Sequence, residues 1–506
     1  MKLYSNEIIQ LLEGLDPQMA LLQNGESQFT VKMLLDRSHK LAINLHTNGM
    51  QVGDRVIIAS EVGVDFVVIM FATQLLKCQV SIIDPEIGRD TYKSKMEQFD
   101  PQWVFLDSRL AFLQEHPLIR QFYFKYKKDG LYFPRKKSIK TITTGRWMPL
   151  FLPNLSLGKI LTQSVKDEVI MESVTDLPYL ITYTSGTVAA PKGVLHSTRG
   201  LRISIELIAN IIKSNQKQIM ATHLPHYMLI GACAGVGTKL WDITWPAAKR
   251  VEFIKDEGIT TVFAPPVEYQ ALIDYCRENQ TMLPDSLTHL IIGSAPVHQA
   301  FLARLIQYLP AHTKITCFYG MTENLVVATI DGRTKVAMQS NGDPLGKPVE
   351  GVDLKIADDG EILIKSDQLY NRYWHLGSRN EWHATGDLGY LDEAGNIILK
   401  SRKKDMIIRK NFNLYPGLYT STIQKIDGVI DAVFIGKYNE ERADEEVHLF
   451  VEAQPKLTKE MLWEKLKSGS QSIDKDAWPD EIHFTQIPRK GRQFKIDRNK
   501  LRESIG

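Results

Sequence analysis

The segment YTSGTVAAPKG, at residues 183–193, places three aliphatic hydroxyls, two glycines and a lysine between apolar runs. Backbone N–H groups of a glycine-rich turn, together with serine and threonine hydroxyls, form a concave surface that binds phosphate oxygens. Lys192 would add a positive charge beside a polyphosphate. The segment is not a Walker A motif, because Gly193 stands where that motif requires Ser or Thr. Alone, it fits either a phosphate loop or an ordinary connection.

The order of these residues resembles the phosphate loop of the adenylate-forming superfamily, YTSGT-(T/S)-G-x-PKG. That superfamily includes acyl-CoA synthetases, the adenylation domains of peptide synthetases and luciferase. In its members, the loop holds the β- and γ-phosphates of ATP. The resemblance implies this role for Thr184, Ser185, Gly186, Thr187 and Lys192.

A second segment, FYGMTE (318–323), resembles the superfamily motif (G/Y)-YGxTE. Its residue types suit a nucleotide, since an aromatic ring can stack on adenine and a carboxylate can bind Mg²⁺. The resemblance implies that Tyr319 stacks on adenine, Gly320 and Met321 line the AMP site, Thr322 binds the α-phosphate and Glu323 binds Mg²⁺. Without the resemblance, a strand running into a helix N-cap fits the segment equally well.

Further segments match the superfamily in the same order along the chain. They are GSAP (293–296), GEILIKS (360–366), TGD (385–387), SRKKD (401–405) and GRQFKIDRNKL (491–501). The resemblance implies that Ser294, Ala295 and Pro296 pass beside adenine, that Asp387 and Arg402 bind the ribose, and that Lys495 is the mobile catalytic lysine. Taken singly, TGD fits a turn and Lys495 fits a solvated basic tail.

The implied chemistry is ATP-dependent activation of a carboxylic acid to an acyl-adenylate, with release of pyrophosphate. A thiol, either of CoA or of a carrier-protein phosphopantetheine, would then accept the acyl group. Because carboxylate and ATP are both anions, Mg²⁺ and Lys495 are expected to neutralise and orient them. The catalytic residues expected are Lys495, Thr322 and Glu323, and no side-chain nucleophile is needed.

The implied acyl pocket has no charged wall. Its expected residues are Tyr227, Met228, Pro266, Gly293 and Ser294, with Met321 beside them. Peptide-synthetase domains place an aspartate after the aromatic residue to hold an ammonium group, and HYMLIGACAG (226–235) contains none. An apolar acid is therefore expected, a fatty acid ahead of an aryl acid.

The chain also departs from the superfamily pattern. Ala189 replaces a glycine of the phosphate loop, Met228 replaces a histidine, and Lys410 and Asn411 replace glycines that let the C-terminal domain close over pantetheine. These departures keep two alternatives open. One is closure of the adenylate by the substrate's own hydroxyl to a β-lactone, and the other is a degenerate member that binds nucleotide or acyl ligand without turnover.

The scaffold expected to position these residues is α/β. Short apolar runs rich in β-branched residues, at 55–60, 79–84, 102–107, 177–183, 260–266, 288–293 and 313–320, alternate with helical patterns such as 65–77 and 298–309. This alternation predicts parallel sheets covered by helices. Hairpin signals beyond residue 340 predict a β-rich lobe.

The resemblance implies two domains. Residues 1–403 would form a large N-terminal domain of two α/β lobes and the β-rich lobe. Residues 404–506 would form a small mobile α+β domain, with the hinge near Lys404.

Composition favours a reducing, cytoplasmic compartment and excludes several classes of protein. The chain has 506 residues, a net charge of +2, and four cysteines without a CxxC pattern, so neither a disulfide framework nor a zinc site of cysteines is indicated. No signal peptide or spanning helix is expected. The basic, aromatic segment 120–146 fits either a solvated loop or a docking face for anionic lipid or an acyl carrier protein. No nucleic-acid partner is expected.

Overall fold

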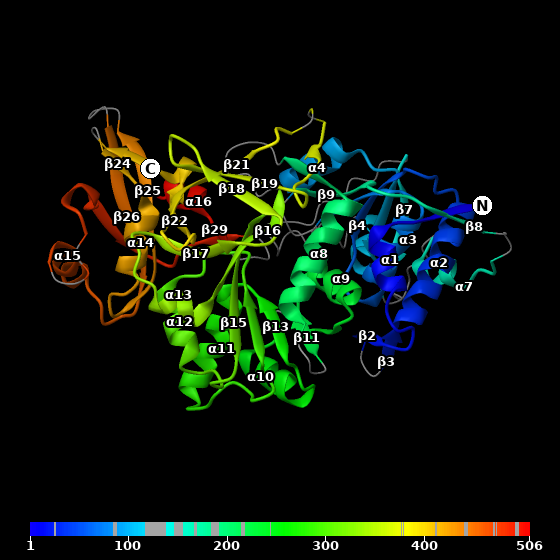
Figure 1. Ribbon diagram of the computed structural model, residues 1–506, viewed down its shortest axis with the longest axis horizontal. Helices are drawn as coiled ribbons and strands as arrows, with labels where there is room; N and C mark the ends of the chain where they lie inside the picture. The colour runs from blue at the N-terminus through cyan, green and yellow to red at the C-terminus, as the bar shows by residue number, and fades with distance from the viewer. Residues whose placement is uncertain are drawn as a thin grey trace.

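The computed structural model describes the chain except for residues 25–26, 84–88, 117–137, 146–154, 166–168, 184–191, 214–217, 243, 376, 378, 410–411, 440–443, 469–470, 472, 491–494 and 506. Most of the basic segment 120–146 therefore lies outside the described residues. Figure 1 shows two α/β lobes side by side and a smaller C-terminal lobe at one end. Within the described ranges, no helix has the length and apolar character needed to cross a membrane.

The first lobe is built on a seven-stranded sheet in the order β20-β10-β9-β5-β4-β6-β7. The five strands from β9 to β7 are parallel, and β10 and β20 are antiparallel to their neighbours. Its strands are β4 (Arg55–Ala59), β5 (Gln79–Ile82), β6 (Trp103–Asp107), β7 (Lys140–Thr144), β9 (Pro178–Tyr183), β10 (Gly193–Ser197) and β20 (Arg372–Tyr373). The outer helices are α4 (Arg89–Phe99), α5 (Ser108–Glu115) and α7 (Leu157–Thr162).

The second lobe carries a thirteen-stranded sheet in the order β18-β19-β21-β22-β17-β16-β15-β14-β13-β11-β12-β2-β3. Its parallel strands are β11 (Ile219–Thr222), β12 (Gly237–Leu240), β13 (Thr261–Ala264), β14 (His289–Ile292) and β15 (Lys314–Met321), and β2 (Ala20–Asn24) and β3 (Ser27–Thr30) extend one edge. Helices α10 (Ala247–Asp256), α11 (Pro266–Glu278), α12 (Gln299–Ile306) and α13 (Gly332–Ala337) belong to this lobe.

The predicted β-rich region continues this same sheet. Its strands are β16 (Asn324–Asp331), β17 (Asp343–Pro348), β18 (Val352–Ile356), β19 (Glu361–Ser366), β21 (His383–Leu391) and β22 (Ile397–Arg402). Gly360 and Gly395 occupy left-handed conformations, at φ 83° and 80°, in the turns between β18 and β19 and between β21 and β22. The glycines of DDG and EAG therefore make the two hairpins that their spacing predicts.

The main hydrophobic core lies between the two sheets. It is formed by α1 (Glu7–Glu13), α2 (Val31–Thr47), α3 (Val64–Leu75), α8 (Thr198–Ile212) and α9 (Pro225–Ala234). Helix α3 is apolar on all sides and is buried along almost its whole length, because it packs within this layer. The short parallel pair β1 (Lys2–Ser5) and β8 (Ile170–Ser173) lies beside this core.

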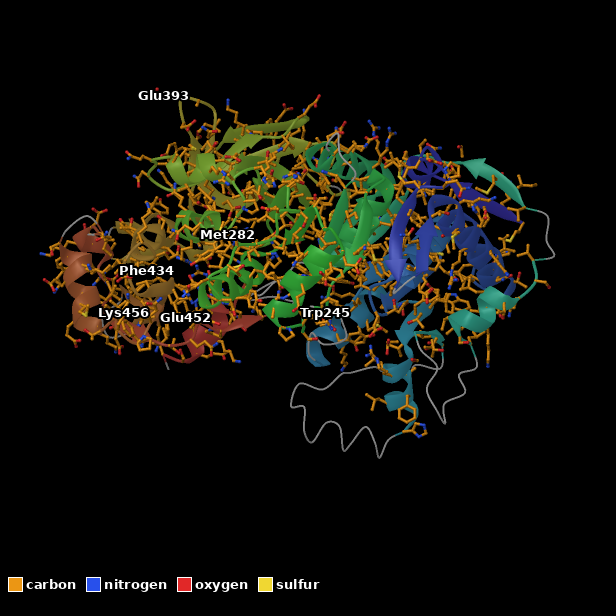
Figure 2. The ribbon with its side chains drawn as sticks, turned by 90° about the horizontal axis from the view of Figure 1, so that it is seen from below. Trp245, Met282, Glu393, Phe434, Glu452 and Lys456 are labelled. Carbon is orange, nitrogen blue, oxygen red and sulfur yellow. The ribbon has the colours of Figure 1, made fainter. Side chains whose placement is uncertain are left out.

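The C-terminal lobe has its own hydrophobic clusters, formed by residues from Ile407 onward. Its elements are β23 (Ile407–Arg409), β24 (Phe412–Leu414), α14 (Pro416–Ile423), β25 (Val429–Asn439), β26 (Asp444–Ala453), α15 (Lys459–Lys467), β27 (Glu481–Phe484), β28 (Arg489–Lys490), β29 (Lys495–Ile496) and α16 (Arg498–Glu503). Figure 2 places Phe434, Glu452 and Lys456 in this lobe, away from Trp245 of the second lobe. The short helix η1 (Lys403–Asp405) precedes it, and the domain boundary at Lys404 stays a prediction.

Candidate active site

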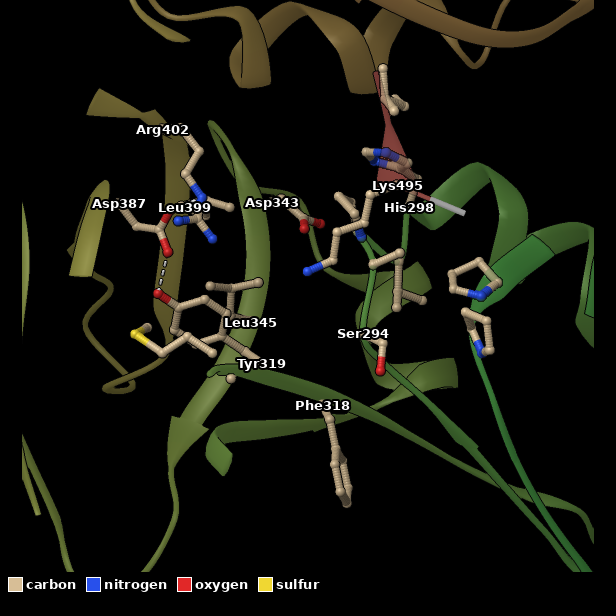
Figure 3. A pocket seen from close by; sticks show the side chains of 18 of the residues that line it. Ser294, His298, Phe318, Tyr319, Asp343, Leu345, Asp387, Leu399, Arg402 and Lys495 are labelled. Carbon is tan, nitrogen blue, oxygen red and sulfur yellow. Dashed lines mark hydrogen bonds and ion pairs between the residues drawn. The ribbon is translucent and has the colours of Figure 1, made fainter. Parts of the chain in front are cut away.

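A cleft of about 820 Å³ is lined by residues of both the N-terminal lobes and the C-terminal lobe. Figure 3 shows Lys495 directed into it, with Asp387 and Arg402 on one side and Ser294 on the other. The cleft brings together these residues expected from the sequence: Lys192, Pro266, Ser294, Ala295, Pro296, Tyr319, Gly320, Met321, Thr322, Glu323, Asp387, Arg402, Lys404 and Lys495. Segments far apart in the sequence therefore converge on one space.

Thr322 and Glu323 occupy the tight turn of the hairpin formed by β15 and β16. Met321 and Asn324 are cross-strand partners, so only these two residues connect the strands. The alternative of a strand running into a helix N-cap is therefore wrong. The strand irregularity beside this turn requires Gly320, because a Cβ at that position would overlap the Leu325 carbonyl.

Asp387 and Arg402 face each other as cross-strand partners on β21 and β22. Arg402 Nε lies 2.6 Å from Asp387 Oδ1, and the Tyr319 hydroxyl donates a hydrogen bond to Asp387 Oδ2 at 2.5 Å. Asp387 is 1% exposed, and burial raises the pKa of its carboxyl, although Arg402 and the Tyr319 hydroxyl act in the opposite direction.

Asp387 Oδ1 is a buried acceptor that makes no aligned hydrogen bond with any described residue, in spite of its close ion pair. In the protein alone, the Arg402 guanidinium balances the charge of this oxygen. The role of Asp387 in binding the ribose stays a prediction.

Glu323 is held by Tyr373, which sequence reasoning missed. The Tyr373 hydroxyl donates to Glu323 Oε1 at 3.0 Å, and Lys192 Nζ lies 5.4 Å from the centre of the Tyr373 ring. Tyr373 reaches this place because β20 pairs with β10, opposite Val194. Among the described residues, no lysine or arginine pairs with Glu323, so its carboxylate suits a bound cation such as Mg²⁺.

Lys495 extends into the cleft from the short strand β29. Its side chain is exposed to the solvent in the open cleft, but the walls of the cleft surround it and exclude most of the bulk water. This burial lowers the pKa of Lys495, and the positive charges of Arg402 and Lys404 lower it further, while Glu323 acts in the opposite direction. The lysine therefore occupies a position that favours the approach of anions.

Ser294, two residues after the end of strand β14, has a left-handed conformation, with φ 66°. A residue with a Cβ rarely adopts this conformation, and here it carries the chain across the cleft into Ala295 and Pro296. The GSAP segment therefore lines the cleft with a strained serine, and its place beside adenine stays a prediction.

The expected acyl-pocket residues Tyr227, Met228 and Gly293 do not line this cleft. Tyr227 and Met228 are 7% and 1% exposed. The Tyr227 ring stacks on Phe263, with ring centres 3.3 Å apart, and Phe263 contacts Phe318 edge-on at 5.9 Å. Phe318 lines the cleft, so a continuous stack of three rings leads from the cleft wall to Tyr227.

Several expected residues fall outside the described residues. They are Thr184, Ser185, Gly186 and Thr187 of the phosphate loop, together with Ala189, Lys410 and Asn411. The described ends of the loop meet, since Tyr183 and Gly193 are cross-strand partners on β9 and β10.

Two further cleft residues were not expected from the sequence. Burial lowers the pKa of the His383 imidazole, while Glu323 acts in the opposite direction. Lys335 is 1% exposed and forms an ion pair of 2.8 Å with Asp343 in the cleft wall. His383 lies on β21 four residues before Asp387, so one strand brings both to the cleft, whereas Lys335 reaches the cleft from α13.

Comparisons with known proteins agree with this geometry. A family model described as AMP-binding enzyme matches residues 16–374. A propanoyl:CoA ligase of Mycobacterium tuberculosis, whose acyl group carries a methyl-dioxo-octahydroindenyl substituent, is 28% identical over 342 residues, which cover 64% of this chain and 66% of the relative. A fatty acid–acyl-carrier-protein ligase, ScoC of Streptomyces coeruleorubidus, is 28% identical over 313 residues, or 55% of this chain and 58% of the relative.

The fold is also that of a solved structure. O-succinylbenzoate coenzyme A synthetase (MenE) from Bacillus subtilis, in complex with ATP and magnesium ion, superposes with a TM-score of 0.77 at 19% sequence identity. The similarity covers 98% of this chain and 99% of that chain. It extends through the C-terminal lobe, beyond the region that the family model matches.

Proposed function

Since the chain belongs to the AMP-binding enzyme family of the adenylate-forming superfamily, we propose that it activates an apolar carboxylic acid with ATP and transfers the acyl group to a thiol. The observation that carries this proposal is the meeting of Asp387, Glu323 and Lys495 in one cleft. Asp387 can accept hydrogen bonds from a ribose, and Glu323 can hold the metal ion of a triphosphate. The positive charge of Lys495 suits a reacting carboxylate.

In the adenylation step, an oxygen of the substrate carboxylate forms a bond to the α-phosphorus. The bond from that phosphorus to the bridging oxygen breaks, and pyrophosphate leaves. Lys495 would hold its ammonium group between the two anions, and Asp387 with Arg402 would fix the ribose. Mg²⁺, held by Glu323, would neutralise charge on the triphosphate when bound. Thr322 would position the α-phosphate.

In the second step, a thiolate adds to the acyl carbonyl, and AMP leaves as the carbon–oxygen bond of the mixed anhydride breaks. The acceptor thiol is that of CoA or of a carrier-protein phosphopantetheine. Relatives named as a CoA ligase and as an acyl-carrier-protein ligase support this pair of acceptors.

The size of the acid follows from the aromatic stack. Tyr227 stacks on Phe263, and Phe263 contacts Phe318, which lines the cleft. We take this stack as the wall that an acyl chain meets on leaving the cleft. A long chain therefore requires Tyr227 to turn away from Phe263, whereas a compact apolar acid fits without this movement. We propose Tyr227 as the residue that limits chain length.

The test is ATP–pyrophosphate exchange with a panel of carboxylic acids, because exchange reports adenylation whatever the acceptor. Acid-dependent exchange is expected for apolar acids and not for amino acids. Exchange absent with every acid in the panel, in protein that still binds ATP, would support a member without turnover and refute the proposal.

Chain length is tested with Tyr227→Ala, using Tyr227→Phe as the matched control that keeps the ring. Removing the ring is expected to lengthen the preferred acid, with a gain of about 0.8 kcal/mol for each additional buried methylene. The measurement is kcat/KM in pyrophosphate exchange along a series of straight-chain acids. An unchanged length preference would refute the role of Tyr227.

A further inference from the structure

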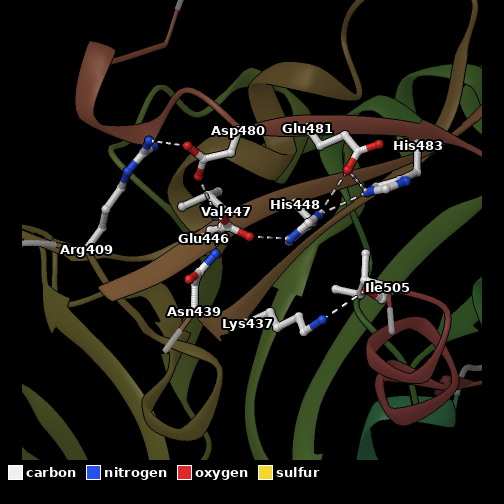
Figure 4. Close-up of polar contacts among 10 residues, drawn as sticks. All are labelled: Arg409, Lys437, Asn439, Glu446, Val447, His448, Asp480, Glu481, His483 and Ile505. Carbon is white, nitrogen blue, oxygen red and sulfur yellow. Dashed lines mark hydrogen bonds and ion pairs between the residues drawn. The ribbon is translucent and has the colours of Figure 1, made fainter. Parts of the chain in front are cut away.

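A cluster of two histidines and a glutamate lies on the C-terminal lobe, outside the cleft already described. Strands β26 and β27 run parallel there, with His448 opposite Glu481 and Phe450 opposite His483. Because neighbouring positions on a strand alternate between faces, His448, Glu481 and His483 share one face of the sheet. Figure 4 shows the three side chains directed toward one another.

We propose that His448, Glu481 and His483 form a binding site for a divalent transition metal ion of the zinc type. The cluster is a group of metal-ligating atoms within 4.8 Å of one another, and the proposal is independent of the proposed function.

The distances between the three ligand atoms fit a single ion. His448 Nδ1 lies 3.0 Å from His483 Nε2, and Glu481 Oε2 lies 3.9 Å and 3.7 Å from these two nitrogens. A point equidistant from atoms with these separations is about 2.1 Å from each, which is the usual length of Zn–N and Zn–O bonds. The three groups thus surround a point at coordination distance before any rearrangement.

A simple hydrogen bond between the imidazoles accounts for only part of this arrangement. It uses one proton and leaves the Glu481 carboxylate beyond hydrogen-bonding distance of both rings. An ion at the common point satisfies all three groups together.

Contacts with neighbouring side chains restrict both rings. The His483 ring is stacked on Phe450, with centres 4.5 Å apart and an interplanar angle of 18°, which restricts its rotation. His448 is 5% exposed, and its Nε2 makes no hydrogen bond with a described residue but lies 3.8 Å from Glu446 Oε2. A carboxylate beyond the distal nitrogen commonly orients a metal-binding histidine.

The donor set also selects the metal. Two imidazole nitrogens and one carboxylate oxygen suit Zn²⁺, Co²⁺, Ni²⁺ or Cu²⁺, whereas Mg²⁺ and Ca²⁺ prefer oxygen ligands alone. Glu481 is 59% exposed, so the ion can enter from solvent and keep one position open to water.

The test uses the full, tag-free chain without nucleotide, titrated with Co²⁺ and monitored by visible absorption. One equivalent is expected to bind with the intense bands of low-coordinate Co²⁺, to be displaced by Zn²⁺ and to be unaffected by millimolar Mg²⁺. His448→Gln and His483→Gln are each expected to weaken binding at least tenfold, while His312→Gln, at an exposed histidine outside the cluster, leaves it unchanged. Absent binding at millimolar Co²⁺, or equal binding in the cluster variants, overturns the site.

Circular dichroism of the metal-free variants checks that they fold. A second measurement needs no variant, namely anomalous scattering from crystals of the wild-type chain soaked with Zn²⁺. A peak between His448, Glu481 and His483 supports the site, and a peak only elsewhere overturns it.

Discussion

At the scale of single residues, the pKa of Lys495 is set by the groups around it. Burial and two neighbouring cations lower its pKa, so the free protein loses this positive charge at a lower pH than a solvated lysine, whose pKa is about 10.4. The charge is present below the shifted pKa and lost above it. We therefore expect kcat/KM for adenylation to fall on the alkaline side below the ordinary lysine range. In Lys495→Arg, this fall should move to higher pH.

Removal of the same side chain gives a second prediction. Lys495→Ala should slow pyrophosphate exchange by about 10²–10³-fold, the usual effect of losing one electrostatic group at a reacting centre. Lys500→Ala, at an exposed lysine on α16, is the matched control and should retain activity. Equal exchange in wild type and Lys495→Ala would remove the lysine from the reaction.

Ser294 carries backbone strain that glycine would relieve. At φ 66°, the Cβ of Ser294 is crowded by the backbone, and glycine has no Cβ. Ser294→Gly should therefore stabilise the folded chain by up to about 1 kcal/mol. Ser294→Ala retains the Cβ and should give no gain. The midpoints of urea unfolding compare the two, and equal midpoints would mean that the surrounding contacts already offset the strain.

At the scale of elements, β20 connects two parts of the site. It adds to the first sheet beside β10, and its Tyr373 hydroxyl holds Glu323 on the second. Tyr373→Phe removes one hydrogen bond to a carboxylate, worth about 1.5–3 kcal/mol. We expect pyrophosphate exchange in this variant to need about tenfold more Mg²⁺. Tyr438→Phe, at a 60% exposed tyrosine, should not change the requirement.

Local sequence patterns predicted interior strands of both large sheets. Runs of β-branched residues identified β4, β6, β13 and β14, because these strands are buried on both faces. The patterns did not reveal that the FYGMTE segment turns back on itself. That hairpin forms because β16 has a place in the large sheet, which the segment itself does not encode.

The unpredicted parts of the site are contacts between residues distant in sequence. Tyr373 meets Glu323 only through the pairing of β20 with β10, and the folded chain brings Tyr227 of α9 onto Phe263 of β13. The motifs predicted residues that line the cleft, since each motif is local. They did not predict the side chains that hold those residues in place.

At the scale of the whole molecule, the C-terminal lobe contributes Lys495 while resting on the other lobes. Asp405 Oδ2, in η1, lies 3.2 Å from Arg498 Nε, so the connection and α16 are joined in this arrangement. Transfer to a thiol would require the lobe to turn about Lys404, which remains our proposed hinge.

A proline at the proposed hinge should distinguish adenylation from transfer to the thiol. Lys404→Pro fixes φ and restricts the preceding residue, so rotation should be blocked. We expect pyrophosphate exchange to persist and thioester formation to fall by at least 100-fold. Lys404→Ala removes only the side chain and should retain both steps. Equal loss of both steps in the proline variant would point to damage of the cleft instead.

The late arrival of β20 also has a consequence for synthesis. The first sheet is otherwise complete at Ser197, yet its edge stays uncovered until residues 372–373 have left the ribosome. At about 5–20 residues per second, translation of the intervening chain takes roughly 10–35 s. Throughout that interval, the nascent polypeptide carries an open strand edge on β10, so this is the period in which it would need a chaperone most.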